Sequence, residues 1–555
     1  MSDSESTHVD ATVARLADFA MDLISEWPMT GGAVALVDRD GVLATFGFGV
    51  ADAYGDEPAT PHHVYEIGSI SKTFISLVVN QLIDERTMSL DEPVTDVLPW
   101  LSLGEGAPTV TVGQVLSHTG GLIMGSDGYP DDRAQIWSLR DRALIPDPLE
   151  HFNYSNVGYM ALGQAIQART GELVDTAMRR RIFAPLGMEG TFGRIREAMR
   201  ETMAVGLWPQ REDSPWVPDE ALVPATWFEV DCTDGNVASS ATDMAAFARL
   251  LLGDGSVDGV RLVSPEGMAR LSTPTAPQGE DIVGLRGGFI CTDSRYGLGV
   301  NVEVVDGRTC LTHGGGMVGY QTFILADRDA GIGVVALTNA NGCYPVAQVI
   351  ARAGHQLLVR PDLALPPAAD AVAVADAAPV GELVGEFSSA DGTEVVIAGD
   401  EAARLTVTTA GVIGRLVRIW NGRYVCDHPD LRAFRWDVVR TGGGIGWTTG
   451  PHVLTRNAAD DVPALRHAAL IGRYRSFSPW YPTFRIFERH GGLYLAAPGG
   501  VEAPEGDCLL VAVADGQWRI GEEEWQPSRL VAGPEVDGEV IFVYRDGHAY
   551  SRFVD

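Results

Sequence analysis

The only lysine of this 555-residue chain, Lys72, stands three residues after Ser69. All other members of the 41 Lys+Arg are arginines. A lysine amine can lose its proton when it is buried or crowded by charge, whereas arginine stays protonated, so Lys72 is a candidate for proton-transfer chemistry. Positions three apart share one face of a helix. If a helix begins near Ser69, the pair can act as nucleophile and base; otherwise Ser-x-x-Lys only marks a helix start.

A second polar group occurs at Tyr154-Ser155-Asn156, at the start of an apolar segment with helical character. The Tyr154 phenol can pass a proton, and the Asn156 amide can hold both a substrate carbonyl and a lysine. Without the Ser69 motif, the same three residues would more often be an ordinary helix cap.

A third group is the glycine run that follows His313 between two strand-like segments. Glycines at Gly314, Gly315 and Gly316 would let the strand edge approach a substrate closely, and the Gly316 amide could donate to an oxyanion. Taken alone, three glycines are more often a turn.

Together, in this order, the three groups resemble the active-site serine hydrolases of the penicillin-binding protein and class C β-lactamase family. Further landmarks of that family occur in their usual order at residues 115–122, 185–191, 239–244 and 296–299. The resemblance covers roughly residues 20 to 360, and seven matches in the same order would hardly arise by accident. It implies that Ser69 is the nucleophile, Lys72 its base and Tyr154 the group that passes the proton to the leaving group. It also implies that Asn156 orients the substrate and that the backbone amides of Ser69 and Gly316 form the oxyanion hole.

One departure concerns the substrate. Where the family's lactamases and D,D-carboxypeptidases carry Lys-Thr-Gly, this chain has His313-Gly314-Gly315. The lysine of that triplet helps to hold a substrate carboxylate, and histidine is a weaker, pH-dependent substitute. The His-x-Gly form is typical of the family's D-aminopeptidases, amidases and esterases. We therefore expect poor activity on β-lactams and on the cell-wall peptides that D,D-carboxypeptidases cleave.

The cysteines and histidines give no metal signal. The six cysteines are scattered without close pairs, which predicts reduced and mostly buried thiols and neither a disulfide scaffold nor a zinc site. His62 and His63 lack partners at ligand spacing, and His118 is expected to hold a loop together by hydrogen bonds. We therefore expect no metal and no cofactor.

The net charge of −33 argues against binding to nucleic acid or to an anionic membrane. No apolar run approaches the length of a membrane-spanning helix. The N-terminus is acidic and lacks the basic and apolar parts of a secretory signal, so a cytoplasmic location is expected. The expected partner is a small-molecule or peptide substrate, and the sequence leaves a monomer and a homodimer open.

The elements that must position the site form the first of several expected domains. The length favours roughly three to four domains. We expect an α/β (α+β) fold in residues 1–360, a β-lactamase-like antiparallel sheet flanked by helices, with a helical insert near residues 90–240. Residues 32–37 and 42–47 flank a hairpin turn. Loops bearing Trp137, Trp208, Trp216 and Trp227 either line the mouth of the site or are pinned by their tryptophans.

Beyond a Pro-rich linker at residues 361–380, the pattern changes to short strands with glycine-rich turns. Residues 383–388 resemble residues 470–475, which predicts two copies of a small antiparallel β-barrel at 381–462 and 463–555. A comparable pair of lipocalin-like barrels occurs in the family's D-aminopeptidases.

Three classes of function remain open. The first is a D-stereoselective amidase, aminopeptidase or esterase acting through an acyl-enzyme on Ser69. The second keeps the same residues but is a penicillin-binding-type thioesterase or peptide cyclase, a β-lactamase or a D,D-carboxypeptidase. The third is a catalytically quiet binding protein, against which the complete set of Ser69, Lys72, Tyr154 and Asn156 argues.

Overall fold

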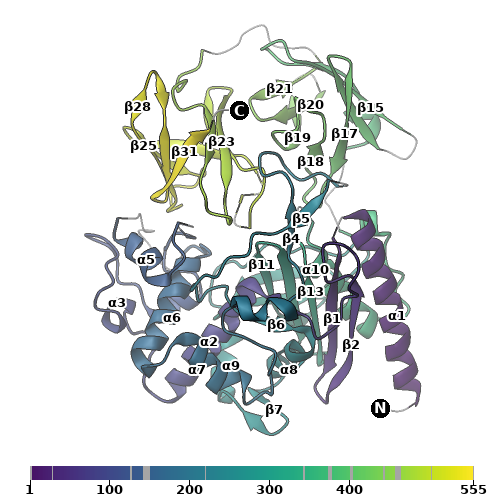
Figure 1. Ribbon diagram of the computed structural model, residues 1–555, viewed down its shortest axis with the longest axis vertical. Coiled ribbons are helices and arrows are strands. Elements are labelled where there is room, and N and C mark those ends of the chain that lie inside the picture. The colour runs from purple at the N-terminus through teal and green to yellow at the C-terminus, as the bar shows by residue number, and fades with distance from the viewer. Residues whose placement is uncertain are drawn as a thin grey trace. The chain divides into compact units, whose positions relative to one another are not determined.

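The computed structural model describes most of the chain (Figure 1). The described residues are 3–27, 29–125, 128–141, 150–218, 220–341, 344–372, 378–400, 404–441, 444–456, 464–501, 503–504 and 506–553. The chain forms two compact units. The sheet unit comprises Met1–Trp208, Leu222–Asn341 and Pro345–Ala373, and the barrel unit comprises Pro209–Ala221, Gly342–Tyr344 and Val374–Asp555.

The sheet unit is built on seven antiparallel strands in the order β2-β1-β13-β12-β11-β10-β9. Their bounds are β1 Gly31–Asp38, β2 Val42–Gly49, β9 Cys291–Tyr296, β10 Asn301–Val305, β11 Arg308–Met317, β12 Tyr320–Asp327 and β13 Ile332–Thr338. The predicted hairpin is confirmed by the pairing of β1 with β2. Because the N-terminal hairpin pairs with β13, segments some 300 residues apart in sequence lie side by side.

Helices cover both faces of this sheet. A side chain added at Gly333 of β13 would meet Ala248 of α8 (Ala241–Leu252), whereas the next residue, Val334, packs toward Gly354 of α10 (Val346–Val359). Successive strand residues point to opposite faces, so α8 and α10 lie on opposite sides. Leu16 of α1 (Asp3–Glu26) contacts the same position of α10, which places α1 with α10. This layered arrangement is the one predicted.

The predicted insert is mainly helical, with short helices joined by loops. Besides α8, the elements between the hairpin and β9 are β3 Val64–Glu66, η1 Gly68–Ile70, α2 Ser71–Asp84, α3 Val94–Val97, α4 Val112–Leu116, α5 Asp132–Trp137, η2 Ser138–Asp141, α6 Asn156–Thr170, α7 Val174–Met178, η3 Arg179–Phe183, η4 Glu197–Thr202, β4 Leu207–Pro209, β5 Leu222–Pro224, β6 Ala238–Ser240, β7 Ser256–Val257, β8 Val260–Arg261 and α9 Pro265–Leu271. Nearly every residue of α2 is buried, as its apolar sequence predicts.

Across the described residues, no helix combines the length and the apolarity that a bilayer crossing requires. The five cysteines that the structure describes are free thiols, and three of them, Cys232, Cys310 and Cys426, are buried.

The first part of the segment predicted as a linker is attached to the sheet unit. Arg15 of α1 donates hydrogen bonds to the carbonyls of Pro361 and Leu363, and η5 (Ala368–Asp370) follows within the sheet unit. Residues 373–377 lie outside the described part. Helix α11 (Val380–Leu383) then opens the barrel unit.

The first barrel is an eight-stranded meander in sequence order, and a bridge between Ser388 and Thr455 nearly closes it. Its core is centred on Trp436 and Trp447, which are both fully buried. Its strands are β14 Gly385–Ser388, β15 Glu394–Gly399, β16 Leu405–Thr409, β17 Val412–Arg418, β18 Tyr424–Cys426, β19 Trp436–Thr441, β20 Gly444–Thr449 and β21 His452–Leu454.

The second barrel is closed by the pairing of its first and last strands, β22 and β31. Its strands are β22 Gly472–Arg475, β23 Thr483–Arg489, β24 Gly492–Ala496, β25 Cys508–Ala514, β26 Gln517–Ile520, β27 Arg529–Ala532, β30 Phe542–Arg545 and β31 His548–Phe553, with a separate ribbon of β28 Glu535–Val536 and β29 Glu539–Val540. The two repeats seen in the sequence are the first strands of the two barrels, β14 and β22. The prediction of two C-terminal barrels is confirmed.

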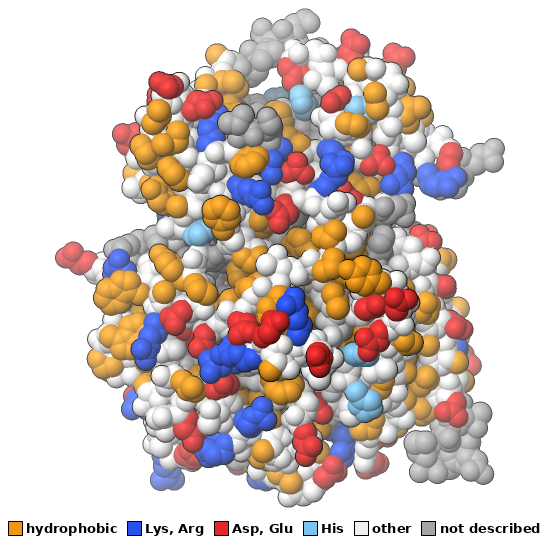
Figure 2. All heavy atoms as spheres, viewed as in Figure 1, with side chains coloured by type: hydrophobic (Ala, Val, Ile, Leu, Met, Phe, Trp, Pro, Cys, Tyr) orange, Lys and Arg blue, Asp and Glu red, His pale blue; other side chains and the backbone are white. Residues whose placement is uncertain are grey.

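On the face drawn in Figure 2, arginine side chains are interspersed among the acidic ones. Some of the acidic groups are paired locally with arginines, as in the exposed pair of Arg261 with Asp254.

Candidate active site

Ser69 and Lys72 lie side by side where η1 runs into α2. The Lys72 Nζ donates a hydrogen bond of 3.0 Å to the Ser69 Oγ. Ser69 is half-buried, whereas the Lys72 side chain has no exposed surface. The hydroxyl is therefore reachable from solvent while its amine partner is held inside the fold.

Asp234, which sequence reasoning missed, completes the surroundings of the amine. The Lys72 Nζ donates to the Asp234 carbonyl at 3.1 Å and lies 3.5 Å from the Asp234 carboxylate Oδ2. Burial disfavours the charged amine, and this nearby carboxylate favours it. The only sequence signal for Asp234 is its place shortly before the landmark at residues 239–244.

The Tyr154 phenol is the third member of the group. It is hydrogen-bonded to the side chain of Ser69, and the Lys72 Nζ lies 5.0 Å from the centre of its ring. Burial, and secondly the charge of Glu280, raise the pKa of Tyr154 well above its ordinary value. The phenol therefore keeps its proton at neutral pH and can donate it.

His118 anchors the segment that carries Tyr154. Its carbonyl accepts from the Asn153 N–H at 2.9 Å, and its Nδ1 accepts from the Ser155 N–H at 3.0 Å. The His118 ring also packs against the Tyr154 ring, with 4.3 Å between centroids. This is the loop-holding role expected from the sequence. Because Nδ1 accepts, the proton of the neutral ring is on Nε2.

Asn156 is brought to the same place by helix α6. Ser155 caps this helix by accepting from the Gly158 N–H, so Asn156 is the first helical residue. The Asn156 N–H donates to the Met124 carbonyl at 2.7 Å, and its side chain is almost fully buried.

The glycine run of β11 passes directly beside η1. A side chain at Gly315 would strike the Ile67 carbonyl, and one at Gly68 would lie 2.7 Å from the Gly316 nitrogen. Gly68 also has a φ of +55°, a conformation that favours glycine. The absence of side chains thus allows the Gly316 amide to approach the start of the Ser69 turn. A side chain at Gly314, by contrast, would meet only the Phe323 ring, at an ordinary contact distance of 3.9 Å.

His313 lies on the same strand but is fully buried. Its Nδ1–H donates to the Gly314 carbonyl at 2.7 Å, so its Nε2 accepts from the Tyr296 hydroxyl at 2.8 Å. Burial lowers the pKa of His313 to about 3, and the nearby charge of Lys72 contributes. The ring is therefore neutral across the ordinary working range of pH.

Glu280 is a further acidic side chain near these residues that sequence reasoning missed. Its Oε2 lies 3.9 Å from the His313 Nδ1, and 29% of its side-chain surface is exposed. Burial raises the pKa of Glu280 to about 8, while the charge of Lys72 opposes this effect. The residue sits in a loop with no periodic pattern, so the sequence carries no signal for it.

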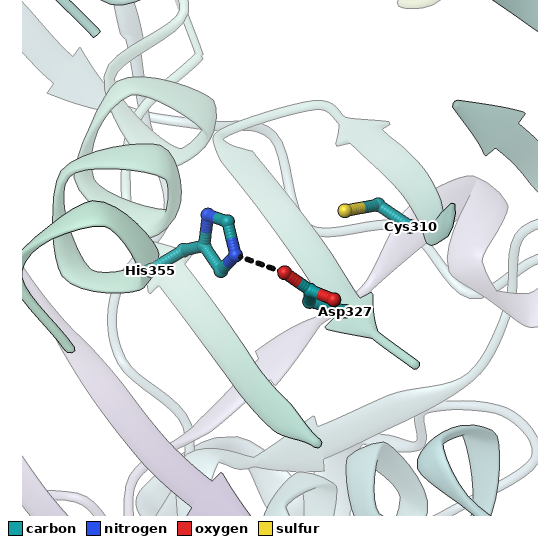
Figure 3. Close-up of side chains that lie close together, drawn as sticks. All are labelled: Cys310, Asp327 and His355. Carbon is teal, nitrogen blue, oxygen red and sulfur yellow. Dashed lines mark hydrogen bonds and ion pairs between the residues drawn. The ribbon is translucent and has the colours of Figure 1, made fainter. Parts of the chain in front are cut away.

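Two buried clusters contain metal-ligating residue types. Cys310, Asp327 and His355 meet beneath the sheet, and Figure 3 shows the His355 ring directed at the Asp327 carboxylate. The His355 Nε2 donates to Asp327 Oδ2 at 2.8 Å, and Arg308 donates to the same oxygen at 2.9 Å. Asp327 Oδ1 accepts two backbone N–H groups. The arginine already supplies the positive charge that a metal ion would bring, so we interpret this cluster as a structural network.

The second cluster, Asp132, Cys232 and Asp234, adjoins Lys72. The Asp132 carboxylate accepts hydrogen bonds of 3.0 Å from the N–H and from the hydroxyl of Thr233. Asp234 faces the lysine amine. Both carboxylates thus have partners within the protein.

Comparison with known proteins finds relatives of this chain. The chain is 28% identical over 317 residues to "Penicillin-binding protein 4" of Amycolatopsis lactamdurans, covering 56% of this chain and 80% of that protein. It is 25% identical over 366 residues to the "D-aminopeptidase" of Gluconobacter oxydans (strain 621H), covering 64% and 63%, respectively. The chain thus spans less than two thirds of that aminopeptidase.

A solved structure, the octameric penicillin-binding protein homologue from Pyrococcus abyssi, matches with a TM-score of 0.57 and 21% identity, over 80% of this chain and 99% of that one. This likeness concerns the fold alone. The family model described as "Beta-lactamase" matches residues 16–358, which include every element of the site described above. The chain belongs to the beta-lactamase family of serine hydrolases and penicillin-binding proteins.

Proposed function

We propose that the protein is a serine hydrolase that forms an acyl-enzyme on Ser69 and cleaves amides, peptides or esters of D-amino acids. The observation that carries this proposal is the 3.0 Å hydrogen bond between a reachable Ser69 hydroxyl and the buried amine of Lys72. A nucleophilic hydroxyl needs a neighbouring group that takes its proton, and this pair supplies both.

In the proposed acylation step, the Ser69 Oγ attacks the substrate carbonyl carbon as Lys72 accepts its proton. The Asp234 carboxylate then stabilises the ammonium that forms. The protonated Tyr154 phenol is hydrogen-bonded to Ser69 and passes a proton to the leaving amine or alcohol. In the second step water attacks the ester carbon and gives a proton to the Tyr154 phenolate, the Lys72 ammonium returns its proton to the Ser69 Oγ, and the acid product leaves.

The negative oxygen of the tetrahedral intermediate would be held by the backbone amides of Ser69 and Gly316. The close approach of Gly68 to Gly316 supports this pairing. Asn156, at the start of α6, would orient the substrate carbonyl. Gly314 and Gly315 would form the strand edge along which the substrate lies.

Three features support a D-aminoacyl substrate over a carboxylate-bearing one. His313 is neutral, so it offers no charge to a substrate carboxylate. Glu280, when it is ionised near its raised pKa of about 8, adds a negative charge that would repel a substrate carboxylate. A D-aminopeptidase is among the relatives.

A matched set of substrates tests the proposal. The rate constant kcat/KM should be higher for D-alanine p-nitroanilide than for its L-enantiomer, for an acyl-D-Ala-D-Ala peptide and for benzylpenicillin, and Ser69→Ala should abolish all turnover. Efficient hydrolysis of penicillin would favour a β-lactamase. Turnover of acyl thioesters alone would favour the thioesterase alternative.

A further inference from the structure

Within the proposed hydrolase function, on which this inference rests, we propose that Glu280 forms the subsite that binds the free ammonium group of the substrate. The carboxylate would hold the cation beside Ser69, so that recognition of a free amino terminus is built into the loop before β9.

The backbone of Glu280 is fixed while its side chain remains free to bind. The Glu280 N–H donates to the Asn301 side-chain oxygen at 3.1 Å, and its carbonyl accepts from the Ser294 hydroxyl at 3.3 Å. These contacts attach the loop to β9 and β10. The side chain keeps 29% of its surface exposed, so a ligand can reach it.

The Glu280 carboxylate lacks a compensating donor in the part of the chain that the structure describes. Its nearest basic nitrogen is the His313 Nδ1 at 3.9 Å, but the hydrogen on that atom is directed at the Gly314 carbonyl. The Lys72 amine is hydrogen-bonded to Ser69 and to the Asp234 carbonyl. A partly desolvated carboxylate without a hydrogen-bond donor is unfavourable, and a bound ammonium would remove this cost.

The charge of Glu280 acts on the groups around Ser69. Burial contributes most to the raised pKa of Tyr154, and the charge of Glu280 contributes second most. The same charge also raises the pKa values of Tyr159 and Tyr296. In an α-aminoacyl substrate the ammonium is only two bonds from the carbonyl carbon that Ser69 attacks. A subsite for it must therefore lie close to Lys72 and Tyr154, which is where Glu280 is found.

This subsite has a pH dependence with two limbs. Glu280 must be ionised, which is favoured as the pH rises toward its raised pKa of about 8. The substrate must keep its proton, and an α-amino group loses it near pH 7.7–8.0. Recognition should therefore fall on either side of about pH 8. The groups that face Glu280 from its own loop and the packed elements are Lys72, Tyr154, Tyr159, Asp281, Tyr296, Glu303 and His313.

The test measures how strongly two amides protect Ser69 from a neutral fluorophosphonate in the full-length protein, with labelling followed by intact-protein mass spectrometry. The amides are D-alaninamide, which carries an ammonium, and N-acetyl-D-alaninamide, which does not. In the wild type, the concentration of D-alaninamide that halves the labelling should be at least tenfold lower than that of N-acetyl-D-alaninamide. Glu280→Gln should abolish this difference, and Glu280→Asp should retain part of it. Asp293→Asn, which removes an exposed charge from the neighbouring strand β9, should leave it unchanged.

Equal protection of the wild type by both amides, or an undiminished preference in a folded Glu280→Gln protein, would overturn the ammonium subsite while leaving Ser69 as the nucleophile. An unlabelled Ser69 in the wild type would instead overturn the hydrolase function, and the subsite with it. Circular dichroism of each variant separates loss of recognition from loss of fold.

Discussion

At the scale of single residues, the site depends on an amine held in a buried and polar setting. Lys72 contacts the Ser69 hydroxyl, the Asp234 carbonyl and the Asp234 carboxylate at once. These contacts fix the direction of its Nζ toward Ser69. Tyr154 remains protonated, so the acceptor of the serine proton has to be another group, and Lys72 is the one in hydrogen-bond contact.

Replacement of Lys72 by arginine should therefore lower kcat by at least about 100-fold, the typical contribution of a general base. Arginine keeps the positive charge but cannot take the proton. The measurement is kcat on the best D-aminoacyl ester, with the unfolding transition followed by circular dichroism to confirm that the fold survives. Lys72→Met serves as the comparison that removes both charge and base. Activity in Lys72→Arg within tenfold of the wild type would refute the role of Lys72 as the base.

At the scale of elements, strand β10 is tied to helix α10 by a buried ion pair. The two terminal nitrogens of the Arg352 guanidinium each donate to the Glu303 carboxylate at 2.9 Å, and the Thr312 hydroxyl donates to it at 2.7 Å. Burial alone would raise the pKa of Glu303, but Arg352 and these hydrogen bonds hold it below its usual range. The pair thus helps to keep β10, and with it Asn301, in position beneath the loop of Glu280.

Glu303→Ala should destabilise the protein by about 3–5 kcal/mol, because it leaves the Arg352 charge buried without a partner. The double variant Glu303→Leu/Arg352→Met should lose less of the free energy of unfolding than Glu303→Ala does, because it leaves no buried charge without a partner. The stabilisation by Glu303 should be complete above the unfolded pKa of about 4.3 and should disappear as the pH falls through the lower folded pKa. Denaturant unfolding at pH 7 and pH 3 measures both effects. A double variant as unstable as the single one would contradict this account.

Sequence patterns predicted the elements better than the side-chain contacts. Local spacing carries the Ser69, Tyr154 and glycine motifs and the hairpin, and the repeat of residues 383–388 at 470–475 carries the barrel pair, so the sequence predicts all of these. Asp234 and Glu280 were not visible. Asp234 lies 162 residues from Lys72 in the chain, and Glu280 lies in an irregular loop, so only the folded chain brings them to the site. The neutrality of His313 likewise follows from its burial in the folded chain and not from the sequence motif.

At the scale of the whole molecule, the two units are not consecutive in sequence. Residues 209–221 leave the insert and fold with the barrel unit. There Arg432 donates to the Ser214 hydroxyl and to the Glu220 carboxylate at 3.1 Å, and Arg415 donates to the Pro218 carbonyl at 3.2 Å. Trp216 of this segment is buried, whereas Trp137 of the other loop is exposed.

Arg432→Ala should loosen this segment and increase tryptic cleavage after Arg211 by several-fold, because Glu220 and Ser214 lose their shared donor. The barrels should remain folded, since Arg432 is not part of their apolar cores. Cleavage rates by mass spectrometry of the native full-length protein provide the measurement. Arg404→Ala, which removes an exposed pair with Asp400, is the matched control. Equal cleavage of the Arg432→Ala and Arg404→Ala proteins would show that these contacts do not hold the segment.

The most direct test of the central claim is to trap the acyl-enzyme. The wild type is mixed with a D-alanine ester, quenched in acid within the first turnovers and digested for peptide mapping. The account predicts an added D-alanyl group on the peptide that contains Ser69, and none on the same peptide of Ser69→Ala. An acyl group on another residue, or full hydrolysis of the ester by Ser69→Ala, would contradict it.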